Sequence, residues 1–370
     1  MIIGTPKEIK NHEYRVGLTP ASVQELVSHG HEVIIETSAG TGIGATDHDY
    51  KKAGAEILQS AAEIFAKAEM IIKVKEPQPN ECKMLREGQI LYTYLHLAPD
   101  PEQTELLIKS EAVCIAYETI TGPDNSLPLL APMSEVAGRL AVQAGAHALE
   151  KPQSGMGVLL GGVPGVAPAR VLVIGGGIVG DNAAVIARGM GAEVTILDRS
   201  VPRLRALDNK YQGTLRCLYS NTATIEEELA TTDMVVGAVL IPGAAAPKLL
   251  SRAMISNMKA GSVVVDVAID QGGCFETSKA TTHAEPTYVV DDVVHYCVAN
   301  MPGAVPKTST YALNNATLPH ALAIANHGWK KALAEDDDLL NGLNVCHGKV
   351  TYQAVSDALD LAYTPAQEFL

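Results

Sequence analysis

An apolar segment that runs directly into closely spaced glycines constrains the fold of this chain more than any other feature. Residues 169–180 read Ala-Arg-Val-Leu-Val-Ile-Gly-Gly-Gly-Ile-Val-Gly, and an alanine-rich helical segment follows them. A second short apolar segment then ends on Asp198. Strand, glycine turn, helix and strand in this order predict a βαβ unit with parallel strands.

The same segment has the spacing of a dinucleotide-binding turn. Gly175 allows a tight turn, Gly177 lets the backbone approach a pyrophosphate, and Gly180 lets helix and strand pack closely. Asp198 lies about 20 residues on, where a carboxylate accepts from the ribose hydroxyls of NAD and disfavours a 2′-phosphate. A glycine-rich turn without a ligand is the alternative. The order and spacing of the strand, the glycines, the helix and the acid along the chain favour the cofactor site.

Composition excludes several classes of protein. At 370 residues the chain is long enough for two domains. Its net charge of −14 argues against a nucleic-acid partner. No apolar run is long enough to span a membrane, and no signal peptide is recognisable at the N-terminus. The six cysteines are scattered without metal-binding spacing, as in reduced cytoplasmic proteins. We therefore expect a cytoplasmic location.

Short apolar strands alternate with helical segments on both sides of the glycine loop. Long helices are expected at 134–151 and 309–333, shorter ones at 61–68, 80–86 and 101–110, and a loop or hairpin at 155–168. The strands are expected at 1–4, 32–36, 70–74, 90–94 and 113–117, and then at 171–174, 194–197, 234–238, 262–267 and 288–290. This alternation predicts an α/β protein with two doubly wound, Rossmann-like domains, mainly parallel sheets and a cleft between them.

The division into domains follows from the position of the glycine loop. We expect residues 131–304 to form the NAD-binding domain. Residues 1–130 and 305–370 would form a discontinuous substrate domain, because the segment 309–333 follows the last strand and carries no nucleotide motif.

Polar residues follow several of the expected strands. Lys75, His96 and Glu118 each stand at or just beyond the end of a strand in the first half, and Arg15 lies in the loop after the first strand. In the second half, Asp270 and Asn300 also lie at or just beyond the ends of apolar segments. Ligands of open α/β sheets bind outside the carboxyl ends of the strands. We therefore expect these side chains to converge on one cleft.

Each of these residues also has an ordinary structural explanation. An isolated Lys75 is more often a solvated lysine, His96 a loop histidine and Asp270 a helix cap. Arg15 could form a surface ion pair of little energetic value. Glu118 could cap a helix or pair with a lysine, and both alternatives stay open at this point.

Taken together, several segments resemble the alanine dehydrogenase family. They are Arg-Val-Gly-Leu-Thr-Pro at 15–20, Lys-Val-Lys-Glu-Pro at 73–77, His96, the glycine loop, Asp-Val-Ala-Ile-Asp-Gln-Gly-Gly-Cys-Phe-Glu at 266–276, Val-Ala-Asn-Met-Pro at 298–302 and Pro-Lys-Thr-Ser-Thr-Tyr at 306–311. The first-half motifs are shared with the α subunit of nicotinamide nucleotide transhydrogenase. The segment 266–276 points toward the alanine enzyme.

The resemblance implies roles for particular residues. Arg15 and Lys75 would hold the substrate, His96 would act as acid and base, and Asp270 would assist proton transfer. Beside Gly175, Gly177 and Gly180, the residues implied to line the cofactor are Ser134, Ile178, Val179, Asp198, Arg203, Ser220, Val239, Leu240, Val267, Asn300 and Met301. A homo-hexamer is also implied.

Two departures from the family pattern have consequences. Some members bind magnesium through a Glu and a His four residues apart, but this chain has Ala323 before His327, so no metal is expected there. Asp181 places an acid beside the phosphate-binding turn. It suits the positive end of a helix dipole, yet it would repel a pyrophosphate and so weaken cofactor binding.

The resemblance therefore implies reversible, NAD-dependent oxidation of L-alanine to pyruvate and ammonia, and the composition predicts neither a nucleic-acid nor a membrane partner. Two alternatives differ in class. A transhydrogenase-type subunit would transfer hydride without an organic substrate. A non-catalytic NAD-sensing module would need the glycine loop and Asp198 but neither Lys75 nor His96.

Overall fold

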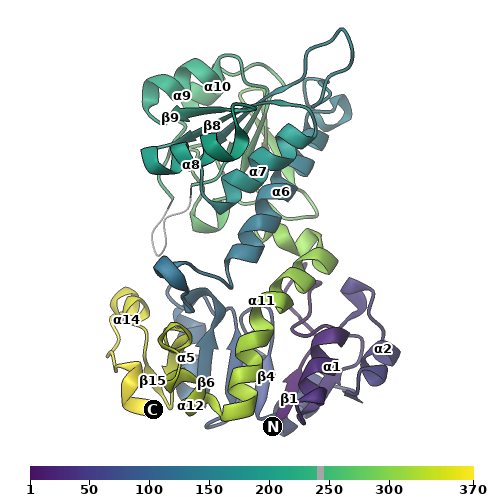
Figure 1. The fold of residues 1–370 in the computed structure, drawn as a ribbon, viewed down its shortest axis with the longest axis vertical. Coiled ribbons are helices and arrows are strands. Elements are labelled where there is room, and N and C mark those ends of the chain that lie inside the picture. The colour runs from purple at the N-terminus through teal and green to yellow at the C-terminus, as the bar shows by residue number, and fades with distance from the viewer. Residues whose placement is uncertain (240–245) are drawn as a thin grey trace. The chain divides into compact units, whose positions relative to one another are not determined.

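The computed structural model describes residues 1–239 and 246–370, which form two compact units (Figure 1). Unit 1 comprises Met1–Met133 and Val305–Leu370, and unit 2 comprises Ser134–Ala304. Each unit is built on a sheet of its own. None of the helices within the described ranges is both long and apolar enough to cross a membrane.

In the described part of unit 1 the sheet has eight strands in the order β15-β14-β6-β5-β4-β1-β2-β3. The strands from β6 to β3 are parallel, whereas β14 and β15 add an antiparallel edge. Their bounds are β1 Ile2–Thr5, β2 Glu32–Glu36, β3 Glu56–Leu58, β4 Met70–Ile72, β5 Ile90–Thr93, β6 Val113–Ala116, β14 Leu343–Cys346 and β15 Lys349–Val350. The helices are α1 Pro20–Ser28, α2 Asp47–Lys52, α3 Ala61–Lys67, α4 Pro79–Cys82, α5 Pro101–Ser110, α11 Pro306–His327, α12 Trp329–Ala334, α13 Asp337–Leu340 and α14 Gln353–Leu359.

Helices cover both faces of this sheet, so its central strands are apolar throughout. In β5, Leu91 belongs to a core with Phe65 of α3 and Leu107 of α5. The next residue, Tyr92, points to the other face, where its hydroxyl donates to the carbonyl of Thr317 in α11 at 3.2 Å. Successive side chains of a strand alternate between faces, and a strand buried on both sides needs apolar residues at every position.

In the described part of unit 2 the sheet has seven strands in the order β12-β13-β11-β10-β7-β8-β9, with β12 antiparallel to β13 and the rest parallel. The bounds are β7 Arg170–Ile174, β8 Glu193–Asp198, β9 Arg216–Tyr219, β10 Met234–Gly237, β11 Val263–Asp266, β12 Thr287–Val290 and β13 Val293–Tyr296. The helices are α6 Ala131–Ala148, which begins at the end of the first segment of unit 1, α7 Ile178–Gly189, α8 Val201–Tyr211, α9 Thr222–Leu229 and α10 Arg252–Ser256.

The strand order of unit 2 reverses beside β7. The chain proceeds from β7 outward to β8 and β9, and then returns to place β10 on the other side of β7. Such a reversal is a topological switch point, where open α/β sheets bind their ligands. The glycine loop leaves β7 at this point.

The predicted fold class, α/β with two mainly parallel sheets, is confirmed. The expected helix 309–333 is instead two helices, because Gly328 at φ 78° ends α11 and begins α12. The helix expected at 80–86 is the single turn α4. Residues 155–168 form a loop with one antiparallel bridge, between Val163 and Val166. The strands β3, β9, β13, β14 and β15 were not among the expected strands.

Helix α11 holds the loop that carries Arg15. The amide of Asn314, whose residue is 3% exposed, donates to the carbonyl of Gly17 at 3.0 Å and accepts from the backbone N–H of Thr19 at 2.9 Å. It also accepts from the hydroxyl of Ser22 at 2.9 Å. On the opposite side, an added Cβ on Gly17 would meet the carbonyl oxygen of Ile72 at 2.4 Å. The loop is therefore held between α11 and the end of β4.

We expect Asn314→Ala to lower the free energy of unfolding by about 1–3 kcal/mol, because it leaves the buried backbone groups of Gly17 and Thr19 without partners. Urea unfolding followed by circular dichroism measures this change. Asn326→Ala is the matched control in the same helix, since Asn326 is exposed and bonds only to His29 and His31 within the described residues. Equal losses in the two variants would contradict the role of Asn314.

Candidate functional site

Three of the predicted residues of unit 1 follow neighbouring parallel strands. Lys75 comes after β4, His96 after β5 and Glu118 after β6, and these strands are adjacent in the sheet. Arg15 lies in the loop after β1, which is the next strand on the other side of β4. Since the carboxyl ends of parallel strands meet at one edge, the fold brings all four residues to the same edge of unit 1.

The guanidinium of Arg15 is buried and already has an acidic partner. Its Nε and Nη2 donate to the two carboxylate oxygens of Glu13 at 2.7 and 2.5 Å, and Nη1 lies 3.1 Å from the Sδ of Met133. Burial lowers the pKa of Arg15, but the hydrogen bonds and charge of Glu13 outweigh that effect and raise it. Arg15 is thus a buried cation whose orientation is fixed by Glu13, not the surface ion pair of the ordinary alternative.

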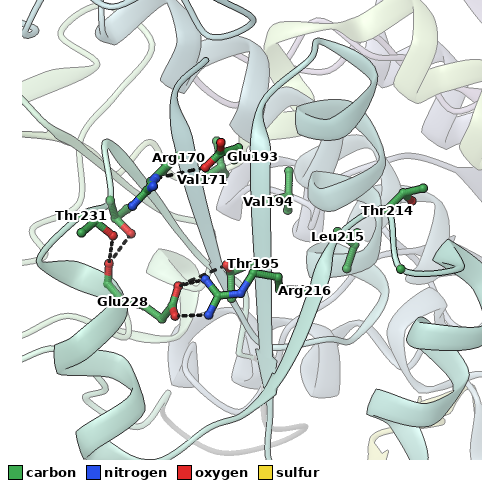
Figure 2. A pocket seen from close by; sticks show the side chains of 12 residues that line it. Arg170, Val171, Glu193, Val194, Thr195, Thr214, Leu215, Arg216, Glu228 and Thr231 are labelled. Carbon is green, nitrogen blue, oxygen red and sulfur yellow. Dashed lines mark hydrogen bonds and ion pairs between the residues drawn. The ribbon is translucent and has the colours of Figure 1, made fainter. Parts of the chain in front are cut away.

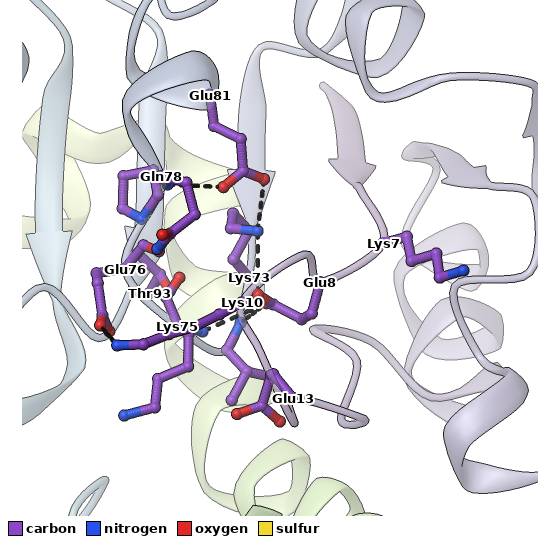
Figure 3. A network of polar contacts seen from close by, with 12 residues as sticks. Lys7, Glu8, Lys10, Glu13, Lys73, Lys75, Glu76, Gln78, Glu81 and Thr93 are labelled. Atoms are coloured by element: carbon purple, nitrogen blue, oxygen red, sulfur yellow. Dashed lines mark hydrogen bonds and ion pairs between the residues drawn. The ribbon is translucent and has the colours of Figure 1, made fainter. Parts of the chain in front are cut away.

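Lys75 stands beside a buried ionic cluster (Figure 3). The ammonium of Lys73 donates to Glu81 at 2.8 Å and to Glu8 at 3.1 Å, and all three side chains are buried. Burial lowers the pKa of Lys73, whereas the two carboxylates raise it more. Burial also raises the pKa of Glu8, and the attraction of Lys73 opposes that rise only in part.

Glu8 connects this cluster to the backbone of Lys75. Its Oε1 accepts from the N–H of Val74 at 2.7 Å and from that of Lys75 at 3.3 Å. The hydroxyl of Thr93 donates to the carbonyl of Lys75 at 3.0 Å. The side chain of Lys75 points away from the cluster, and its ammonium has no hydrogen-bond or ion-pair partner within the described residues. The cluster therefore fixes a backbone from which a half-exposed cation projects.

His96 is held in an unusual backbone conformation. Its φ is 51°, in the left-handed region, and its imidazole is exposed. The carboxylate of Glu118 accepts from the N–H of His96 at 2.6 Å and from the N–H of Leu95 at 3.2 Å. Tyr94 stacks on the imidazole with ring centroids 5.7 Å apart and an interplanar angle of 7°. Glu118 thus caps the turn of His96, which is neither of the alternatives that the sequence left open for it.

In unit 2 the glycine loop is shaped to receive a phosphate group. A Cβ on Gly180 would lie 1.8 Å from the carbonyl oxygen of Gly175, which itself has φ 106°. By contrast, a Cβ on Gly177 would meet no protein atom within 4 Å, and Gly177 precedes the first turn of α7 as its N-cap. The backbone is therefore open at the helix N-terminus, where a pyrophosphate binds.

Asp198 is oriented by the backbone of the same loop. One carboxylate oxygen accepts from the N–H of Gly176 at 2.7 Å, and the other accepts from the N–H of Ser200 at 2.7 Å. A Cβ on Gly176 would lie 3.0 Å from that carboxylate and 2.8 Å from Leu207. The position of the acid and the absence of side chains in the loop fit the ribose and pyrophosphate of a dinucleotide.

Arg203 and Asp181 are joined beside this loop. Arg203 Nη2 donates to Asp181 at 2.9 Å, and its Nε donates to the carbonyl of Gly176. Lys210 also donates to Asp181, at 2.8 Å. The repulsion expected between Asp181 and a pyrophosphate is thus offset by two cations.

The Asp270 loop is organised by a buried acid that the sequence did not single out. The carboxylate of Asp266 accepts from the N–H of Ala268 at 3.1 Å, from the N–H of Cys274 at 2.8 Å and from the hydroxyl of Ser278. Asp270 is exposed on this loop, and its Oδ1 accepts from the N–H of Asn300 at 3.3 Å. The backbone of Asn300, like that of His96, is in the left-handed region, with φ 57°.

The other predicted cofactor residues of unit 2 are distributed around the carboxyl end of its sheet. Val239 lies two residues after the end of β10, and Val267 directly follows β11. The N–H of Ser220, directly after β9, donates to the carbonyl of Asp198 at 2.9 Å. Leu240 lies outside the described residues. The remaining ones are Ser134 in α6, Ile178 and Val179 at the start of α7, and the buried Met301 after Asn300.

Sequence reasoning missed the residues that position the site. Glu8, Asp266 and Asn314 are buried and bond to the backbone of the Lys75, Asp270 and Arg15 segments. Glu8 and Asp266 are carboxylates close to apolar strands, which is the one signal that could have found them. Across residues 1–239 and 246–370, no three His, Cys, Asp or Glu side chains gather as metal ligands would, and His327 is the last residue of α11.

Comparisons with known proteins cover the whole chain. The N-terminal domain of the alanine dehydrogenase/PNT family matches residues 4–137, and its C-terminal domain matches residues 141–353. The alanine dehydrogenases of Halomonas elongata and Methanococcus maripaludis are 62% and 58% identical to this chain, over 100% of each sequence. A solved L-alanine dehydrogenase superposes with a TM-score of 0.95 at 53% identity, over 98% of this chain and 100% of that one.

We expect Gly177→Ala to weaken NADH binding at least about tenfold, because a methyl group would keep the phosphates from the N–H groups of α7, whose hydrogen bonds are worth roughly 1.5–3 kcal/mol. Stability should change by less than about 0.5 kcal/mol, since the new Cβ meets no protein atom within 4 Å.

NADH fluorescence and thermal unfolding measure the two effects of Gly177→Ala. Gly189→Ala is the matched control at the other end of α7, where a Cβ also meets nothing within 4 Å. Unchanged NADH affinity in Gly177→Ala would refute this assignment of the phosphate site.

Proposed function

The chain belongs to the alanine dehydrogenase/PNT family, and we propose that it interconverts L-alanine and pyruvate plus ammonia with NAD as the oxidant. The observation that carries the proposal is the likeness over the full chain to alanine dehydrogenases, with Lys75 and His96 at adjacent strand ends. A module that only senses NAD would have no use for these two side chains at that edge.

NAD, when bound, supplies the hydride acceptor. The glycine loop, the first turn of α7 and Asp198 are the elements proposed to hold it, because they leave the backbone open to a phosphate and direct a carboxylate toward a ribose. We assign residues 131–304 to cofactor binding, and residues 1–130 with 305–370 to the substrate.

Lys75 and Arg15 are the proposed substrate-binding cations. The ammonium of Lys75 projects from a backbone that Glu8 fixes, and a point charge of this kind holds a carboxylate or polarises a carbonyl. Arg15 already shares one edge of its guanidinium with Glu13, so its orientation is set before substrate arrives. Preorganised cations avoid the entropic cost of fixing flexible side chains during binding.

The chemistry also needs proton transfers at the substrate nitrogen and at water. The alanine ammonium must lose a proton before its Cα–H bond breaks, and water must add to the resulting imine before ammonia leaves. We assign the proton transfers to His96, because histidine changes charge near neutral pH and this imidazole is exposed on a rigid turn. Asp270 is the proposed assisting group from unit 2.

The assembly and location are further proposals. The family resemblance supports a homo-hexamer, which light scattering on the purified protein would test. All six cysteines carry free thiols, which supports a reducing, cytoplasmic environment.

Turnover of L-alanine with NAD⁺ by the purified full chain tests the proposed function. NADH formation with L-alanine, and NADH consumption with pyruvate plus ammonium, are the expected results. Hydride exchange between nucleotides without an organic substrate would instead favour the transhydrogenase-type alternative. NADH binding without any turnover would favour the sensing module.

We expect Lys75→Ala to bind NADH almost as well as the parent but to lose turnover by a factor of about 10² or more, as for a group that positions the reacting substrate. The rate of NADH formation from L-alanine and NAD⁺ measures turnover, and NADH fluorescence measures binding. Lys7→Ala is the control, because Lys7 is an exposed cation that points away from the cluster. Full activity in Lys75→Ala would return Lys75 to the solvated-surface explanation.

His96→Ala should likewise bind NADH while turnover falls by about 10²–10⁴-fold, the usual effect of removing a positioned acid or base. The rate measured across pH should lose an ionisation that the parent shows. His48→Ala replaces an exposed histidine of α2 and serves as the control. If His96→Ala kept near-parental rates at every pH, Asp270 would become the leading candidate for proton transfer.

A further inference from the structure

One carboxylate beside the glycine loop binds several donors of helix α8. Asp181, in the first turn of α7, accepts from Arg203 Nη2 at 2.9 Å and from Lys210 Nζ at 2.8 and 2.9 Å. The hydroxyl of Tyr211 donates to the same carboxylate and to the Asp181 carbonyl, the latter at 3.0 Å. Asp181 is 14% exposed, so these contacts are partly shielded from water.

The charge state of this cluster is fixed. Burial raises the pKa of Asp181, but the hydrogen bonds of Lys210 and Tyr211 and the two positive charges outweigh it, so the pKa is lowered. Burial and the neighbouring carboxylate raise the pKa of Tyr211, which stays protonated as a donor. At neutral pH the cluster therefore holds one negative and two positive charges.

The cluster lies at the ribose end of the proposed cofactor site. Arg203 Nε donates to the carbonyl of Gly176, and the N–H of the same Gly176 donates to Asp198 at 2.7 Å. Arg203 thus bonds to the carbonyl of Gly176, and Asp198 bonds to the N–H of the same residue. A cation in this place is close to the group that distinguishes NADP from NAD, the 2′-phosphate of the ribose.

Arg203 and Lys210 have the chemistry that a 2′-phosphate requires. The planar guanidinium binds phosphate through paired N–H donors, and an ammonium adds a point charge. Here the carboxylate of Asp181 accepts hydrogen bonds from a terminal guanidinium nitrogen of Arg203 and, through both of its oxygens, from the ammonium of Lys210. A phosphate would have to break these ion pairs to use either cation.

We propose that Asp181 is a second determinant of NAD specificity, which acts by keeping Arg203 and Lys210 bound and so unavailable to the 2′-phosphate of NADP. This inference rests on the proposed function, because it requires a dinucleotide at the glycine loop. Asp198 disfavours the 2′-phosphate by direct repulsion, whereas Asp181 withholds the groups that would attract it. Asp181 is a positioning residue in this account, since it acts through its two partners.

The competing explanation is that Asp181 only repels the pyrophosphate. The two mechanisms differ in which cofactor responds. NADH and NADPH share the pyrophosphate, so loss of a general repulsion would strengthen both equally. Release of Arg203 and Lys210 toward a 2′-phosphate would strengthen NADPH alone. The ratio of the two dissociation constants therefore separates the mechanisms.

The test is titration of the purified full chain with NADH and with NADPH, followed by nucleotide fluorescence. Asp181→Ala should tighten NADPH about tenfold while NADH changes by less than about twofold, because hydrogen bonds to a charged group are each worth roughly a tenfold change or more. The Tyr211 hydroxyl keeps its bond to the Asp181 carbonyl in this variant. Asp181→Asn, of the same shape, replaces it if the alanine variant does not fold.

Glu228→Gln is the matched control for the change in net charge. Glu228 is 12% exposed and pairs with Arg216 at 2.7 and 3.0 Å, beside a pocket of about 260 Å³ at the amino ends of β7 and β8 (Figure 2). Glu228 thus resembles Asp181 in burial and in pairing with a cation. It lies at the amino ends of the strands, however, whereas Asp181 and the glycine loop lie at their carboxyl ends. Its NADPH to NADH ratio should equal that of the parent.

A reversal experiment identifies the cations. Adding Lys210→Met to Asp181→Ala should remove a measurable part of the NADPH gain, because only one freed cation then remains. An unchanged ratio in Asp181→Ala, or an equal gain for both nucleotides, would overturn the inference while leaving the proposed function intact. If the parent binds neither nucleotide, it is the proposed function that fails.

Discussion

A buried lysine shared by two carboxylates is the interaction on which the substrate edge of unit 1 depends. Lys73 neutralises one of the charges of Glu8 and Glu81, and Glu8 in turn accepts from the backbone of Val74 and Lys75. Ion pairs of this kind gain little over apolar packing, but removal of one partner leaves an unpaired buried charge that costs about 3–5 kcal/mol. The cluster therefore fixes the geometry of the strand end more than it adds stability.

A carboxylate that fixes a loop at the end of a strand occurs repeatedly in both units. A carboxylate close to a strand accepts the N–H groups of the loop that carries a proposed functional residue: Glu8 for Lys75, Glu118 for His96, Asp266 for the Asp270 loop and Asp198 for the glycine loop. Strands end by leaving backbone donors without ladder partners, and a buried donor must find one. Acidic side chains supply these partners and also hold the loops in one conformation.

How much of this was predictable depended on whether a residue acts through local sequence or through distant contacts. The glycine loop and Asp198 are separated by one helix, so their spacing alone predicted the βαβ unit and its ligand. The edge strand β14 is short and pairs antiparallel with β6, more than 200 residues earlier in the sequence, so no local pattern revealed it. The two-residue strand β15 pairs with β14 and is too short to show an alternating pattern. Asn314 bonds to a loop 295 residues away, and its role becomes visible only when the chain is folded.

The left-handed backbone of His96 and Asn300 limits how this protein can change over evolutionary time. Such conformations cost about 1–3 kcal/mol for a residue with a side chain, and glycine would relieve that cost. Selection for stability alone would therefore favour glycine at position 96, where it would discard the imidazole. Histidine and asparagine are among the few side chains that tolerate this region, and β-branched residues are excluded. The two positions accept only a narrow set of replacements, and retaining His96 means retaining a residue that makes the fold less stable.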